Sequence, residues 1–428
     1  MEVIGPYTAI IGISVIIIIS YFFNIISKKT NIPSVLMLIG LGILIKQGMK
    51  FIGFSTGEML FNVLEVLGIV GLIMIVLEAS LDLRLSKEKW PTIWKSFSVA
   101  ILSLVLSSLA CAFVINYFII PSFFTSLIYA VPLATLSSAI IIPSVGGLSV
   151  PKKEFMVYEG TFSDILGIMF FYFLIGNAEA ENASMVAVDV FGNITLTVIL
   201  SIIISYTLVL IFQKMTSQVK LFLLIAVLLI LYSVGKLFHL SSLLIILIFG
   251  LVLNNHELFF RGFLKKWIQP TKVKRILDDF HLVTIESAFV VRTFFFVVFG
   301  ITITLSSLYD LEIAIISLFI LLLLFSIRFI MLKVFVQKNL FPQVFIAPRG
   351  LITILLFFAI PDEYKNDDFD SGILLYTIII SCIVMAVALV ASGKKVIPIE
   401  DMSFIYETPS KELDSIESET EIEKMKEL

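Results

Sequence analysis

The sequence predicts an all-α polytopic membrane protein with about 13 transmembrane helices. Hydrophobic residues make up 59% of its 428 residues and charged residues 15%, whereas soluble domains carry about 25% charged residues. The mean hydropathy is +1.07, and thirteen apolar runs approach the roughly 20 residues that a helix needs to cross a bilayer. A soluble core could not bury so many Ile, Leu and Phe side chains, so the composition excludes a water-soluble enzyme.

Each predicted span rests on its own apolar run. Four runs are long and carry at most one charge: 4–24, 92–117, 187–212 and 371–392. Three are near the short limit for a crossing: 32–49, 219–235 and 239–254. Four contain several ionisable residues: 60–79, 155–176, 281–303 and 310–331. Two are interrupted by Pro and Gly: 123–147 and 341–361.

The basic residues predict the orientation of these spans. Loops that follow odd-numbered spans hold 18 Lys and Arg residues, and loops that follow even-numbered spans hold 4. Because cytoplasmic loops collect basic residues, we expect the N-terminus outside and the C-terminus in the cytoplasm. We therefore predict a transmembrane domain over 1–392 and a cytoplasmic acidic tail over 393–428. The tail is short and charged, so we expect it to be disordered.

Five acids and three arginines inside the predicted spans are candidates for function. They are Glu65, Glu78, Glu159, Asp164, Glu286, Arg292, Arg328 and Arg349. An ionised group at the bilayer centre costs about 2.5–3.5 kcal/mol on insertion scales. Such groups persist when they line a polar pathway for ions or protons, or when they form static ion pairs that fix helix packing. The number of charges in one bundle favours a polar pathway. For any single residue, a static ion pair remains an equal alternative.

Two halves of the chain resemble each other weakly. Residues 32–45 match 240–253 at an offset of 208, and an offset of 214 aligns Glu78 with Arg292 and Thr135 with Arg349. Both interrupted spans, 123–147 and 341–361, then occupy corresponding places. Because Pro removes a backbone donor, we expect two crossing broken helices whose unwound backbone lines a cavity. Spans two and nine have opposite orientations, so the repeat would be inverted, as in secondary transporters.

The densest polar motif is YEGTFSDILGI, residues 158–168. Glu159 and Ser163 are four residues apart and share a helix face, while Asp164 is rotated by about 100°. One carboxylate can therefore form a salt bridge while the other faces a cavity. A carboxylate that binds either a hard monovalent cation or a proton gives exchange directly, because each ligand expels the other.

This pattern resembles the monovalent cation:proton antiporters, the sodium/proton exchanger superfamily, over about residues 5–392. The resemblance implies a sodium/proton antiporter-like fold in which Asp164 binds the cation or the proton. Ser163 stands where the family usually has Asn or Asp. In the preceding broken helix, Thr135, Ser137 and Ser138 match the family's polar residues, and which of them contacts the ion stays open.

The resemblance also implies roles for the other buried charges. Arg328 resembles an arginine that pairs with the Glu of the ion-binding span, here Glu159. Arg349, in APRGL, resembles the arginine of the family's GLRG-type motif, and Glu78 resembles an acid of the third span. Arg292 falls where electrogenic relatives often carry a lysine.

The sequence therefore predicts a secondary active transporter that exchanges Na⁺, or alternatively K⁺, for protons by alternating access. We expect that the protein is not an enzyme and that it binds no cofactor and no nucleic acid. The resemblance implies a homodimer in the plasma (inner) membrane of a prokaryote. A sodium-coupled carrier of an organic anion is the alternative, with Arg349 as the anion's partner. A channel would need a selectivity filter, which the sequence does not show.

Overall fold

The computed structural model describes most of the transmembrane region. It covers residues 6–30, 33–51, 70–71, 73–81, 83, 85, 88–177, 183–215, 220–237, 242–260, 266–303, 310–337 and 339–392. In these ranges the chain is all-helical and forms no strand. The acidic tail 393–428, Glu65 and the first part of the predicted span 60–79 lie outside them.

The helices follow the predicted spans in order. They are α1 (Pro6–Thr30), α2 (Ser34–Phe51), α4 (Trp90–Phe118), α5 (Phe123–Ala134), α6 (Ser138–Ser144), α7 (Val150–Gly176), α8 (Ala183–Phe212), α9 (Lys220–Leu237), α10 (Ser242–Asn254), α11 (His256–Phe259), α12 (Pro270–Thr302), α13 (Leu311–Phe335), α14 (Leu351–Phe358) and α15 (Gly372–Ala391). A helical segment at 73–81 carries the end of the third span. Within the described residues, eight helical stretches are long and apolar enough to cross a membrane. The prediction of an all-α membrane protein is confirmed.

Two helix boundaries differ from those of the predicted spans. Helix α12 begins at Pro270, before the predicted span 281–303, because buried apolar residues recur every three or four positions along a charged stretch. The predicted span 341–361 is helical only in α14, Leu351–Phe358. Pro342 and Pro348 cannot donate backbone hydrogen bonds, and the chain before α14 runs as turns and extended segments.

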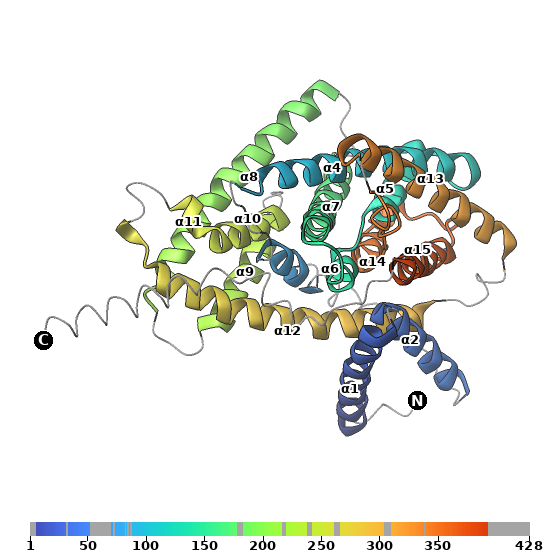
Figure 1. The fold of residues 1–428 in the computed structure, drawn as a ribbon, viewed down its shortest axis with the longest axis horizontal. Coiled ribbons are helices and arrows are strands. Elements are labelled where there is room, and N and C mark those ends of the chain that lie inside the picture. The colour runs from blue at the N-terminus through green and yellow to red at the C-terminus, as the bar shows by residue number, and fades with distance from the viewer. Residues whose placement is uncertain are drawn as a thin grey trace, which may run out of the picture.

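The long helices form two bundles, which pack chiefly within themselves (Figure 1). We call α4–α7 and α13–α15 the core bundle, and α1, α2, α8–α10 and α12 the flanking bundle. In Figure 1 the core helices α6, α7, α14 and α15 are seen close to end-on, while α12 runs beside them. The bundles meet mainly where α10 contacts α7 and where α12 contacts α14.

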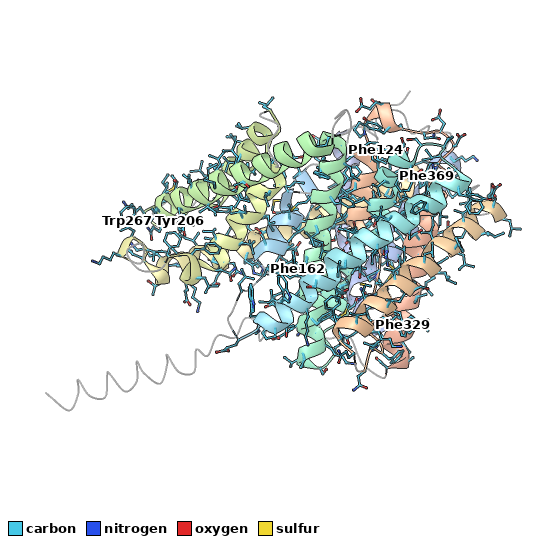
Figure 2. All side chains as sticks on the ribbon, turned by 90° about the horizontal axis from the view of Figure 1, so that it is seen from above. Phe124, Phe162, Tyr206, Trp267, Phe329 and Phe369 are labelled. Carbon is cyan, nitrogen blue, oxygen red and sulfur yellow. The ribbon has the colours of Figure 1, made fainter. Side chains whose placement is uncertain are left out.

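Aromatic side chains mark the extent of the two bundles. Figure 2 shows Tyr206 and Trp267 at the flanking end of the molecule and Phe329 at the core end. Phe162, on α7, lies between them. Helix α7 contacts α10 of the flanking bundle as well as the core helices, so it lies at the boundary of the two bundles.

Candidate functional site

The helix at 123–144 is broken at its centre. Helix α5 ends at Ala134, α6 begins at Ser138, and Thr135 between them has an extended conformation with φ −70° and ψ 132°. Pro132, in the last turn of α5, removes one donor from the helical ladder. The break exposes carbonyl groups at the end of α5 and N–H groups at the start of α6.

The second break crosses the first. The Ser137 N–H donates to the carbonyl of Pro348 at 3.0 Å, so the two unwound segments are joined by a backbone hydrogen bond. A Cβ atom at Gly350 would lie 2.8 Å from Ser137 Oγ. A larger residue at position 350 would have to displace the side chains of Ile140 and Ser137, which lie closest to it. The structure thus contains the two crossing broken segments that the sequence predicts.

Helix α7 places Asp164 against the start of α6. Ser138 donates to Asp164 Oδ2 from its backbone N–H at 3.1 Å and also from its hydroxyl group. The carboxyl group is buried, with a residue exposure of 2%, and its Oδ1 atom makes no hydrogen bond with the protein. One oxygen is therefore held in place while the other remains available to a ligand.

Of the three predicted hydroxyl residues, Ser138 is the one that contacts Asp164. Thr135 donates its hydroxyl hydrogen to Val131 O at 2.9 Å, within its own helix. Ser163 accepts a hydrogen bond from the Leu136 N–H at 2.9 Å. Its neutral hydroxyl thus satisfies the backbone of the break and adds no charge.

A residue that the sequence analysis passed over lets α7 come this close. A Cβ atom at Gly167 would lie 2.3 Å from Thr135 Oγ1, so no larger residue fits there without moving the break. Gly167 is one α7 turn beyond Asp164, on a neighbouring face. The only sign of this role in the sequence was a glycine inside an apolar helix.

Several buried oxygens near the crossing have no hydrogen-bond partner in the described structure. They are Ser137 Oγ, Thr161 Oγ1, Asp164 Oδ1 and Thr353 Oγ1. Thr161 and Asp164 are three residues apart on α7 and so are neighbours on its surface, and Thr353 lies in the first turn of α14. Unpaired buried oxygens are costly, and hard cations prefer oxygen ligands. Oxygens of this kind are the ligands that a partly dehydrated cation needs.

Glu159, one turn before Ser163, has a different partner. Arg328 on α13 contacts both of its carboxylate oxygens, with Nη1–Oε1 at 2.6 Å and Nη2–Oε2 at 3.0 Å. Arg328 Nε also donates to Val344 O at 3.1 Å, before the second break. The pair is buried and bidentate, as the sequence predicts. Its geometry leaves the Glu159 carboxylate fully occupied.

Arg349 is buried between the two breaks. Its Nε donates to Leu133 O, at the end of α5, at 3.1 Å, and its Nη1 donates to Ala347 O at 2.5 Å. A guanidinium at the end of a helix complements the exposed carbonyls and the helix dipole. Arg349 thus stabilises the crossing through the backbone, which argues against its expected alternative role of holding an organic anion.

Three further predicted charges lie outside the core bundle: Glu78 on the segment 73–81, and Glu286 and Arg292 on α12. Arg292 on α12 contacts Glu78 of the segment 73–81, with Nη1–Oε2 at 3.2 Å and Nη2–Oε1 at 3.4 Å. The sequence aligned these two residues as counterparts in a repeat and did not predict that they pair. Glu286, earlier on α12, is exposed and does not join the cluster.

Comparisons with known proteins identify the family of the chain. The family model described as sodium/hydrogen exchanger, transmembrane, matches residues 13–393. No curated protein matches the chain by sequence.

Two structures of the sodium proton antiporter MjNhaP1 from Methanocaldococcus jannaschii are similar to the chain. The structure at pH 8 has a TM-score of 0.66 and 19% identity, and the match covers 90% of this chain and 100% of that one. The electron-microscopy structure has a TM-score of 0.64 and 19% identity, and the match covers 91% and 96% of the two chains. At this level of identity the likeness concerns the fold.

Proposed function

Because the chain belongs to the sodium/hydrogen exchanger family, a family of transporters and not of enzymes, we propose that it exchanges Na⁺ for protons through Asp164. The observation that carries the proposal is the state of that carboxylate. Ser138 holds Oδ2, while Oδ1 is buried without a hydrogen-bond partner. A buried carboxylate of this kind needs a neutralising ligand, and a proton and a Na⁺ ion would compete for the same oxygen.

The proposed cation site consists of Asp164 and the hydroxyl oxygens around the crossing. Ser138 positions the carboxylate, and Ser137 contributes an unpaired hydroxyl oxygen. Ser163 and Thr135 support the site by satisfying backbone groups of the break. A set of neutral oxygens with one carboxylate also suits K⁺, which remains the second candidate.

Alternating access requires that the part of the protein that carries the ion site move relative to the rest of the protein. The core bundle carries both breaks, Asp164 and the Glu159–Arg328 pair, while the flanking bundle contacts it mainly through α10 and α12. We propose that the core bundle moves as a unit against the flanking bundle. The breaks and the buried ion pair keep the site rigid during that movement, since they tie α5, α7, α13 and α14 together.

The proposed function also implies a location and an oligomeric state for the protein. The eight apolar stretches identify an integral membrane protein, and we place it in the plasma (inner) membrane of a prokaryote with its C-terminus in the cytoplasm. We also propose a homodimer. Helix α1 packs against α2 and α12 and leaves large side chains such as Ile10 and Phe22 exposed, which offers an apolar face to a second copy or to lipid.

The decisive experiment replaces Asp164 by Asn in proteoliposomes. The amide keeps the shape of the carboxyl group but cannot bind and release a proton. We expect D164N to insert normally and to lose Na⁺-driven and K⁺-driven pH changes. Asp367→Asn, on an exposed loop, is the matched control and should exchange normally. Near-normal exchange by D164N would reject the proposal.

A further inference from the structure

Thr161 lies on α7, fully buried, and its hydroxyl group has no hydrogen-bond partner in the described structure. We propose that Thr161 is a specificity-determining residue whose hydroxyl oxygen binds the transported cation beside Asp164. The ligand is a small monovalent cation such as Na⁺. This inference rests on the proposed function and deepens it, because it names a neutral oxygen that favours the cation over the proton.

The hydroxyl group of Thr161 differs from those of other buried threonines in this chain. Thr135, Thr284 and Thr377 each donate to the carbonyl four residues earlier, at 2.7 to 2.9 Å. The corresponding acceptor for Thr161 is the carbonyl of Val157, and that bond does not form. Since a buried hydroxyl without a partner is costly, this one is available to a ligand outside its own helix.

The position of Thr161 on α7 brings it next to Asp164. The two residues are three apart, so their side chains point within about 60° of each other around the helix axis. Helical side chains lean toward the N-terminus of the helix, so the Asp164 carboxyl group reaches back over the turn that carries Thr161. Its Oδ1 atom is also buried without a partner. Two unpaired oxygens therefore lie on one side of α7.

The polar groups on the other sides of Asp164 are already used. Ser163 accepts a hydrogen bond from the Leu136 N–H, and Ser138 holds the Oδ2 atom of Asp164. Gly160, one turn before Asp164, has no side chain, and a Cβ atom there would lie 3.4 Å from Ser138 Cα. Helix α7 thus packs closely against α6 at Gly160, while Thr161 offers an oxygen on the adjoining face.

A neutral oxygen beside a carboxylate distinguishes a cation from a proton. A hard cation takes several oxygen ligands at once, whereas a proton is bonded to one carboxylate oxygen. The Thr161 hydroxyl group therefore stabilises the Na⁺-loaded state of Asp164 more than the protonated state. Removing it should weaken the binding of Na⁺ and leave the exchanging carboxylate in place.

The test compares Thr161→Val and Thr161→Ser with the wild type in proteoliposomes. Valine keeps the shape of the side chain without the oxygen, and serine keeps the oxygen. We expect T161V to raise the apparent KM for Na⁺ about tenfold, as the loss of one polar contact does, with an unchanged rate at saturating Na⁺. T161S should restore the wild-type KM. Thr377→Val is the matched control, because that equally buried hydroxyl bonds within its own helix.

Thermal unfolding in detergent gives a reading independent of transport. Because a ligand of the folded state raises Tm, replacing choline chloride by NaCl should raise the Tm of the wild type more than that of T161V. Without Na⁺, T161V should melt no lower than the wild type. A wild-type KM in T161V would overturn the inference. So would a lower Tm without Na⁺ or a failure to insert, since either gives the hydroxyl a structural role. D164N in the same assays reports separately on the proposed function.

Discussion

At the scale of single residues, α7 carries two carboxylates in opposite states. Glu159 has both oxygens bound by Arg328, whereas Asp164 has one oxygen bound by Ser138 and one without a partner. The helix rotation between them, about 140° for five residues, directs the two side chains to different neighbours. The paired charge of Glu159 and the proposed exchanging charge of Asp164 can therefore lie within one and a half helical turns of each other.

The Glu159–Arg328 pair predicts a large loss of stability when one partner is removed. Glu159→Ala or Arg328→Ala leaves an uncompensated buried charge, and breaking a buried pair costs about 3–5 kcal/mol. We expect both single variants to melt at lower temperature in detergent, and the double variant to lose less than the sum of the two.

The matched control is the exposed pair Lys365–Asp362, whose side chains are 57% and 93% exposed. Lys365→Ala and Asp362→Ala should leave the melting temperature almost unchanged, because water already solvates both charges. Strictly additive losses at Glu159 and Arg328 would mean that the two residues do not interact.

The sequence predicted some of these contacts and missed others for a physical reason. Helix spacing and the motif placed Glu159 and Asp164 on separate faces, and the partner Arg328 followed from the family resemblance. The choice of Ser138 over Thr135 could not be predicted, because backbone dihedrals inside the break decide which hydroxyl faces α7. The pairing of Glu78 with Arg292 depends on the packing of distant spans, which local periodicity does not contain.

At the scale of helices, the flanking bundle depends on a close crossing of α2 and α12. A Cβ atom at Gly42 would lie 2.1 Å from Val297 O, and one at Gly300 would lie 2.3 Å from Ile39 O. The two backbones therefore touch, as small residues allow in membrane helix pairs. The obstacle in each case is a backbone atom, which cannot rotate away.

This crossing predicts that Gly300→Ala destabilises the protein although alanine favours helices. Overpacking of a tight contact costs about 1–3 kcal/mol. Gly40→Ala, also on α2, is the control, because nothing lies within 4 Å of the added methyl group. We expect a lower melting temperature for G300A and no loss for G40A. Equal effects would show that the crossing does not contribute.

The sequence predicted a helix correctly where one uninterrupted apolar run covers the whole helix. The start of α12 was missed, because Val273, Ile276 and Phe280 are buried among exposed charges and the mean hydropathy there is low. In the predicted span 341–361 the break at Pro348 was expected, but residues 341–347 before it are not helical either, because an apolar composition does not ensure a helix between two prolines.

At the scale of the whole molecule, the distribution of basic residues predicts the orientation in the membrane. We expect Glu88, in the loop after the third span, to face the cytoplasm and Asp367, after the twelfth span, to face outside. Cys at either position should react with an impermeant thiol reagent only from its own side. The wild type should not react, because Cys111 and Cys382 are buried. Labelling of both from one side would reject the thirteen-span topology.

The balance of buried charges also concerns the whole molecule. Among the described residues, Arg292 pairs with Glu78 and Arg328 pairs with Glu159, while Arg349 donates to backbone carbonyl groups. Two of the carboxylates are engaged by guanidinium groups. In the proposed cycle Asp164 holds either one proton or one Na⁺, and both loaded states carry the same net charge. A core bundle that crosses the membrane only when Asp164 is loaded would then move equal charge in both directions.

This equality predicts one-for-one, electroneutral exchange. Moving one net charge is worth about 2.3 kcal/mol per 100 mV, so a cycle with unequal charges would respond strongly to voltage, whereas a balanced cycle would not. Ser163 supports the prediction because it carries no charge beside Asp164. The measurement imposes a potassium/valinomycin potential on Na⁺-loaded proteoliposomes, follows internal pH and subtracts the leak of D164N liposomes. We expect the same rate and end-point at zero and at imposed potential. A shift of either with voltage would show that a second titrating group takes part.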